Sequence, residues 1–157
     1  MLTWSSFAAR EPEMAAAGRS LLYQYGVGLA FLSTVRPDGG PRVHPMCPVL
    51  HAVGAYGFIV PGPKRSDLRR DPRYAMHSFP AENDENAFYV TGTARPVADD
   101  AVREAAASVY FAERSWEKPP PGFEDQELFE FLIDRALLTT TTGHGDPHPN
   151  HRVWSAT

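Results

Sequence analysis

The sequence holds a single cysteine, Cys47, so no disulfide bond can form within the chain. It has no apolar run close to the ~20 residues that a membrane-spanning helix needs. Its first residues show no basic stretch followed by an apolar one, the pattern of a secretory signal peptide. These absences predict a soluble, cytoplasmic protein without a membrane partner.

An excess of positive charge is also missing. The chain has 15 Lys and Arg against 19 Asp and Glu, for a net charge of −4. This balance argues against nucleic acid as a partner, because binding to phosphate backbones depends on clustered cations. We find no internal repeat, and 157 residues fit one domain of ordinary size. We therefore expect a single domain over residues 1–157.

Turn-forming residues are abundant. Fifteen prolines and twelve glycines indicate many short elements rather than a helical bundle. Short apolar and β-branched runs favour strands, which we expect at residues 29–35, 41–50, 56–60, 74–79 and 87–94, with a turn at 52–55. Within the last of these strands, Gly92 is expected at a bulge or at a close approach of two backbones.

Helices are expected between some of these strands. Apolar residues recur at spacings of three and four over 11–25, and helix-forming residues fill 66–71 and 102–113. Residues 127–142 fit the helical and the strand period equally, and 152–154 read as a final edge strand. The sequence therefore predicts five or six strands with three helices, in an order typical of a β-barrel or an α+β domain.

The segment after the strand at 56–60 carries the clearest chemistry. A Pro–Gly turn leads to Lys64, Arg65 and Ser66 at the start of an expected helix. The free N–H groups of a helix N-terminus bind phosphate, and neighbouring cations strengthen such a site. Arg42 would reach the same place if its strand pairs with 56–60. A solvated basic loop before a surface helix is the alternative, and spacing alone does not decide between them.

Several segments occur in the order found in one known superfamily. They are residues 31–35, 37–39, 41–45, 57–60, Lys64 with 68–73, and 90–94. Together they resemble the pyridoxamine 5′-phosphate oxidase-like superfamily of FMN-binding split barrels. This resemblance implies a mainly β (α+β) fold, a six-stranded antiparallel split β-barrel with flanking helices. It also implies a homodimer that binds flavin at the subunit interface.

The resemblance also implies a cofactor site. Arg42 would hold the cofactor phosphate together with Lys64. Other positions of the implied site are Val43 and His44 along the flavin ring, Ile59 and Val60 through their backbone, Arg65 and Ser66 beside the phosphate, and Asn86 from the sheet. No side chain is assigned as catalytic, and no metal site is expected.

The expected function is that of an FMN-dependent oxidoreductase acting on a small molecule. The true oxidases of this superfamily carry a further lysine near the position of Cys47, so pyridoxamine phosphate is not the expected substrate. A protein binding the deazaflavin F420 or haem, or a non-catalytic flavin-binding module, is the alternative. His144, His148 and His151 are expected in a solvated tail, because intervening prolines prevent a helix that would align them.

Overall fold

The computed structural model describes residues 1–51 and 54–156. The expected turn at 52–55 lies partly outside these residues, and the part that is described, Gly54 and Ala55, belongs to a strand. No helix in the described ranges is long and apolar enough to cross a membrane.

Four helices and eight strands are present in the described part of the chain. The helices are α1 (Trp4–Arg10), α2 (Pro12–Leu22), α3 (Pro63–Arg70) and α4 (Asp100–Ala112). The strands are β1 (Ala30–Val35), β2 (Pro41–Met46), β3 (Val49–His51), β4 (Gly54–Ile59), β5 (Arg73–Ser78), β6 (Ala87–Pro96), β7 (Glu127–Thr140) and β8 (Asn150–Ser155).

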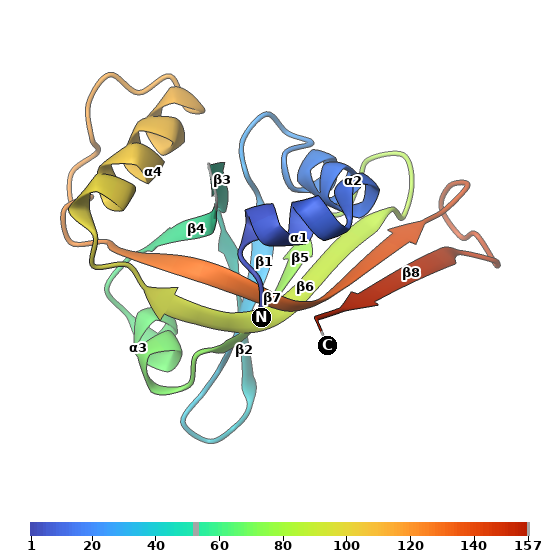
Figure 1. Cartoon of the computed structure of the whole chain (residues 1–157), viewed down its shortest axis with the longest axis horizontal. Helices are drawn as coiled ribbons and strands as arrows, with labels where there is room; N and C mark the ends of the chain where they lie inside the picture. The colour runs from blue at the N-terminus through green and yellow to red at the C-terminus, as the bar shows by residue number, and fades with distance from the viewer. Residues whose placement is uncertain (52–53, 157) are drawn as a thin grey trace.

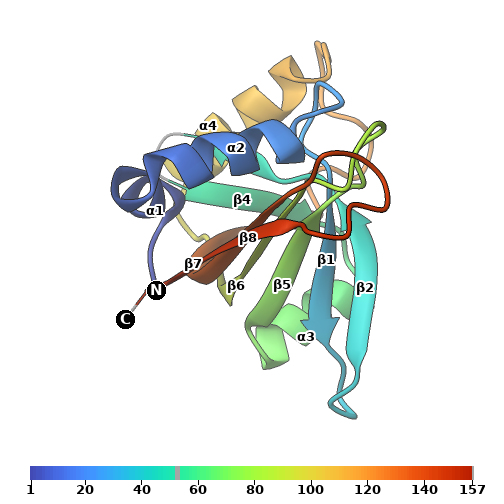
Figure 2. The ribbon, with the colours of Figure 1, turned by 90° about the vertical axis from the view of Figure 1, so that its right-hand side faces the viewer.

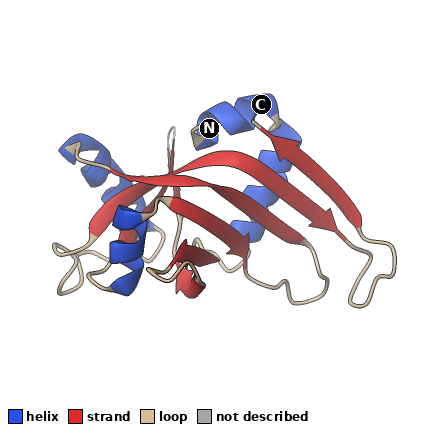
Figure 3. Ribbon diagram, turned by 90° about the horizontal axis from the view of Figure 1, so that it is seen from below, coloured by secondary structure: helices blue, strands red, loops and turns tan. Residues whose placement is uncertain are grey.

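All eight strands join one antiparallel sheet in the order β2-β1-β5-β6-β7-β4-β3, with β8 paired to β7. The sheet curls strongly, and the long strands β6 and β7 run through its middle (Figures 1 and 3). β2 and β3, the two ends of this order, are not paired with each other, so the curled sheet is open along that side. The antiparallel β fold with flanking helices is confirmed, whereas the sheet has eight strands rather than the expected six.

The expected strand at 41–50 is two strands. β2 ends at Met46 and β3 begins at Val49, with Cys47 and Pro48 between them. Proline cannot donate a hydrogen bond to a ladder, which accounts for the break at this position. The two pieces then pair with different neighbours, β2 with β1 and β3 with β4.

The ambiguous segment 127–142 is the strand β7. Its alternate residues Phe129, Phe131 and Ile133 lie in the main core, as one face of a strand should, while Leu128 on the other face is buried in a second, smaller core. The helix α1 was not expected, because its seven residues bury only Trp4 and Phe7 and give a weak periodic signal.

The main core lies between the sheet and the N-terminal helices. α1 and α2 cross one end of the curled sheet, while α3 lies at the opposite end (Figure 2). Phe7 and Met14 are fully buried against sheet residues such as Phe88. Gly18 faces the ring of Phe88, and a Cβ there would lie 2.7 Å from ring atoms, so this glycine permits close helix–sheet packing.

A second, smaller core lies beneath α4. Asp99 caps this helix by accepting hydrogen bonds from the backbone N–H groups of Ala101 and Val102. The buried members of this core are Val49, Tyr56, Phe58, Ala106, Phe123 and Leu128. Their packing fixes α4 against β3 and β4, close to the open side of the sheet.

The bulge expected at Gly92 is confirmed. The register between β6 and β7 shifts between Thr91 and Gly92. A Cβ on Gly92 would lie 1.8 Å from the backbone oxygen of Leu132, a distance that no side chain allows. Glycine is therefore required here by the close approach of the two backbones.

Candidate functional site

The helix α3 begins at Pro63, one turn earlier than the sequence predicted. Gly62 precedes it with φ of 153°, a conformation that glycine adopts without strain. Proline at the first helical position costs no hydrogen bond, because that N–H is unpaired in any helix. Ser66 is exposed within the helix and donates to the backbone oxygen of Gly62 at 3.3 Å, rather than capping the N-terminus.

Asp67, in the middle of α3, connects this helix to the sheet. Its side chain is almost completely buried and accepts a hydrogen bond from Arg42 Nε at 2.7 Å. The Thr34 hydroxyl donates to the same carboxylate oxygen at 3.0 Å, and Arg70 Nη1 donates to the other at 3.2 Å. Arg42 comes from β2 and Thr34 from β1, so one carboxylate ties α3 to both strands.

The pKa of Asp67 reflects these partners. Burial by itself raises the pKa of a carboxyl group, because the charged form loses its hydration. The hydrogen bonds from Arg42, Thr34 and Arg70 act in the opposite direction and prevail, so the pKa of Asp67 lies below its ordinary value. The carboxylate is therefore charged at neutral pH, although it is buried.

Lys64 lies one helical turn before Asp67, on the same face of α3. Its side chain is half-buried, and burial lowers its pKa. It forms no ion pair with the described residues, which leaves its positive charge uncompensated by a carboxylate.

A cleft of about 240 Å³ opens beside Lys64. It is lined by Leu29, Pro45, Met46, Cys47, Phe58, Val60, Lys64, Tyr110 and Gln126. Its walls come from the end of β2, the end of β4, the start of α3 and the second half of α4. The lining is mostly apolar and aromatic with one cation, a combination that suits a planar molecule bearing an anionic group.

Tyr110 brings an aromatic ring from α4 to this cleft. The guanidinium of Arg114 lies over that ring, 3.6 Å from its centroid, and the Phe58 ring centroid is 5.4 Å away. Burial raises the pKa of Tyr110, so its phenol is neutral at physiological pH. No sequence pattern pointed to this residue, because its position depends on how α4 packs against β4.

Arg42 and Lys64 reach the same region by a different route from the expected one. The expectation that their strands pair is wrong for this part of the chain, since β2 pairs with β1 and only β3 pairs with β4. Instead α3 packs mainly against β1 and β6, and its Asp67 contacts Arg42 of β2, while Lys64 lies beside the cleft at Pro45. Pro45 is three positions after Arg42 on β2, roughly 10 Å along the strand, and Arg42 itself does not line the cleft.

The four other positions predicted along the flavin ring point to different sides of the sheet; they are Val43, His44, Ile59 and Val60. His44 shares the inner side of β2 with Arg42, and its Nε2 is buried without a hydrogen-bond partner in the described residues. Val43 points the other way and is 60% exposed. The Ile59 side chain lies in the core, so only its backbone is free to contribute, whereas Val60 lines the cleft.

Two predicted residues lie elsewhere within a single chain. Arg65 turns toward the start of β7, where Nη1 donates to the backbone oxygen of Asp125 at 2.8 Å and Nε lies 3.8 Å from Glu127. Asn86 precedes β6, three strands from β2 in the sheet order. Its side chain accepts from the Thr141 N–H at 2.7 Å. Asn86 therefore does not line the cleft within one chain.

The histidines of the C-terminal segment do not gather. His151 on β8 contacts the Thr139 hydroxyl of β7 at 2.9 Å, and a ring nitrogen of His144 lies 3.2 Å from the backbone oxygen of Glu82. In residues 1–51 and 54–156, no group of three or more His, Cys, Asp or Glu side chains is arranged to hold a metal ion.

Comparison with known families now identifies the fold. The family model described as pyridoxamine 5′-phosphate oxidase matches residues 25–140. This match covers well over half of the sequence, and the chain belongs to that family. The matched range includes β1 to β7 and the whole of α3, so the β2–α3 contact and the cleft both lie within it. A search of curated proteins by sequence returns no significant match.

Solved structures share this fold at low sequence identity. A protein of the pyridoxinephosphate oxidase family from Clostridium acetobutylicum, related to general stress protein 26 of B. subtilis, is similar with a TM-score of 0.65 and 13% identity, covering 92% of this chain and 95% of that chain. A heme binding protein from Mycobacterium smegmatis gives 0.63 and 16%, covering 89% of this chain and 57% of that one. An F420 reductase gives 0.58 and 20%, covering 74% and 94%.

Proposed function

We propose that this protein binds FMN and acts as an FMN-dependent oxidoreductase on a small molecule. The observation that carries the proposal is Lys64, a half-buried cation without a carboxylate partner in the described residues, beside an apolar and aromatic cleft. Arg42 on β2 adds a second cation, which pairs with Asp67 of the same helix as Lys64. Membership of the pyridoxamine 5′-phosphate oxidase family supports a phosphate-bearing cofactor at this place.

The residues of this site suit binding and orientation more than acid–base chemistry. FMN, when bound, supplies the redox chemistry by accepting and returning a hydride. The chain would contribute cations to the phosphate and the walls of Phe58 and Tyr110 to the apolar part of the ligand. Cys47 lines the cleft, and the true oxidases carry a lysine near this position, which supports a substrate other than pyridoxamine phosphate.

F420 and haem are the alternative cofactors. Both carry anionic groups and a planar ring, so the same cleft chemistry admits them, and proteins of similar fold are described as a heme binding protein and an F420 reductase. A non-catalytic flavin-binding module is a further alternative, distinguished from the enzyme by the absence of turnover with bound flavin.

The proposal is tested by the visible spectrum of the purified protein and by fluorescence titration with FMN. We expect two flavin bands after purification or reconstitution and quenching of FMN fluorescence on binding. An intense Soret band would show bound haem instead, and a single absorption band would show bound F420. A protein that takes up none of the three would contradict the proposal.

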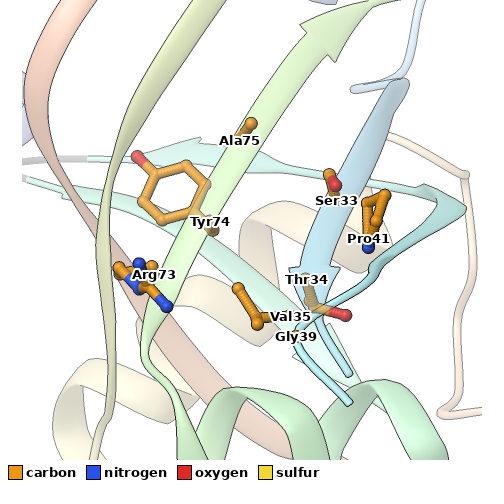
Figure 4. Close-up of a pocket in the computed structure, with 8 residues that line it drawn as sticks. All are labelled: Ser33, Thr34, Val35, Gly39, Pro41, Arg73, Tyr74 and Ala75. Atoms are coloured by element: carbon orange, nitrogen blue, oxygen red, sulfur yellow. The ribbon is translucent and has the colours of Figure 1, made fainter. Parts of the chain in front are cut away.

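We also propose that the functional unit is a homodimer. Along β2, β1 and β5, several side chains that point away from the core are apolar and only partly covered, namely Phe31, Val35, Val43 and Ala75, beside the polar Ser33, Arg73 and His77. A hollow of about 240 Å³ lies on this face, lined by Ser33, Thr34, Val35, Gly39, Pro41, Arg73, Tyr74 and Ala75 (Figure 4). A second copy covering this face would remove apolar surface from water, which favours association.

Substitution of Val43 by lysine should weaken this dimer, because it places a charge in the apolar face. We expect light scattering after gel filtration to give the mass of two chains for the wild type and a shift toward one chain for Val43→Lys. Val153→Lys on β8 is the matched control, since Val153 is 50% exposed, close to the 60% of Val43, but lies on another strand. A monomeric wild type, or a Val43→Lys variant that remains a dimer, would contradict the proposed interface.

A further inference from the structure

We propose that Asp67 is a positioning residue that orients Arg42 toward the anionic group of the cofactor. This inference rests on the proposed cofactor site and concerns how that site is built. Arg42 is bound to Asp67 through Nε alone. The two terminal nitrogens of its guanidinium donate no hydrogen bond to the described residues, so they remain free for a phosphate.

The geometry around Asp67 restricts its carboxylate to one orientation. One carboxylate oxygen accepts from both Arg42 and Thr34, and the other accepts from Arg70. Arg70 also donates to the backbone oxygen of Val35 at the end of β1. Because the carboxylate is buried and held from three sides, Arg42 cannot turn away without removing one of the two cations that pair with this buried charge, which is costly.

The charges at this place balance a phosphate monoester. Arg42, Arg70 and Lys64 carry three positive charges and Asp67 one negative, which leaves a net charge of about +2. A phosphate monoester carries roughly −1.5 to −2 at neutral pH. Removing the Asp67 charge raises the net charge to about +3, so long-range attraction alone predicts tighter phosphate binding. The positioning role predicts weaker binding, and the two effects therefore differ in sign.

The experiment compares FMN with riboflavin, which lacks the phosphate, by fluorescence titration of each variant. The ratio of the riboflavin dissociation constant to that of FMN reports the contribution of the phosphate. Asp67→Asn, which keeps the shape and removes the charge, is expected to lower this ratio about tenfold or more, as expected when a charge-assisted contact is lost. An unchanged or increased ratio would overturn the positioning role.

A matched control separates orientation from charge. Asp71→Asn, at the end of the same helix, removes one negative charge from an exposed pair with Arg73 and touches neither Arg42 nor Lys64. We expect its riboflavin to FMN ratio to stay at the wild-type value or rise slightly. A general loss of stability in Asp67→Asn would weaken both ligands together and leave the ratio unchanged, so a changed ratio is specific to the phosphate.

A further variant keeps the inference testable if Asp67→Asn does not fold. Arg42→Lys preserves the charge but cannot donate to Asp67 and to a phosphate through separate edges of one planar group. We expect both Arg42→Lys and Arg42→Ala to lose most of the phosphate contribution. A wild-type ratio in Arg42→Lys would overturn the inference, because a positive charge without the planar guanidinium would then be enough to bind the phosphate.

The outcomes also separate this inference from the proposed function. If the wild type binds neither FMN nor riboflavin, the proposed FMN site fails and the role of Asp67 fails with it. If the wild type prefers FMN strongly and Asp67→Asn keeps that preference, the site stands and only the role of Asp67 is wrong.

Discussion

Replacing Arg42 and Lys64 together by alanine is expected to weaken FMN binding by about 10²–10⁴-fold. A hydrogen bond to a charged group contributes roughly 1.5–3 kcal/mol, and two such contacts to one phosphate give this range. Lys64 is half-buried beside an apolar cleft, and Arg42 is held by a buried carboxylate, so neither cation is fully surrounded by solvent. The dissociation constant is measured by quenching of FMN fluorescence.

Riboflavin and a charge-matched variant are the controls for this double variant. Riboflavin affinity should fall far less than FMN affinity, because the phosphate is the group that these cations bind. Arg36→Ala with Lys118→Ala removes the same charge from exposed positions and should leave FMN binding close to that of the wild type. If FMN affinity is the same in the Arg42 and Lys64 double variant as in the wild type, the cofactor site lies elsewhere.

Much of the fold was predictable because local patterns and tertiary packing agree. The runs at 29–35, 74–79 and 87–94 became β1, β5 and β6 with small changes at their ends. Gly92 could be assigned to a bulge because a glycine weakens a strand interior and often marks a bulge or a close backbone approach. The number of strands was harder to predict, because Pro48 divides one apparent strand into two and because residues 127–142 also fit a helical spacing.

The site was predictable only in part, because sequence order does not show which neighbour a strand or helix contacts. Arg42 and Lys64 were identified from residue type and resemblance, yet they are linked through α3, whose Asp67 contacts Arg42, rather than through paired strands. Asp67 was visible as a residue three positions after Lys64, but its role required knowing that it is buried. Tyr110 carried no signal at all, since the packing of α4 brings it to the cleft.

The buried carboxylate that organises this site should also make stability depend on pH. The pKa of Asp67 is lower in the folded protein than its ordinary value, so folding favours the charged form. Its contribution to stability is therefore complete above the ordinary carboxyl pKa, and it is lost as the pH falls through that value and then the lower folded pKa. Asp67→Asn should cost about 3 kcal/mol of unfolding free energy at pH 7, where a charged pair is broken.

Urea denaturation of the wild type and Asp67→Asn at pH 7 and near pH 3 checks this dependence. The difference in unfolding free energy between the two proteins should be largest at pH 7 and should shrink as the pH falls, because protonation removes the same charge from the wild type. Comparing the two proteins cancels the other carboxyl groups with lowered pKa, such as Asp38 and Asp146. A difference that stays constant between the two pH values would mean that the Asp67 charge does not hold α3 to the sheet, and the orientation of Arg42 would then need another cause.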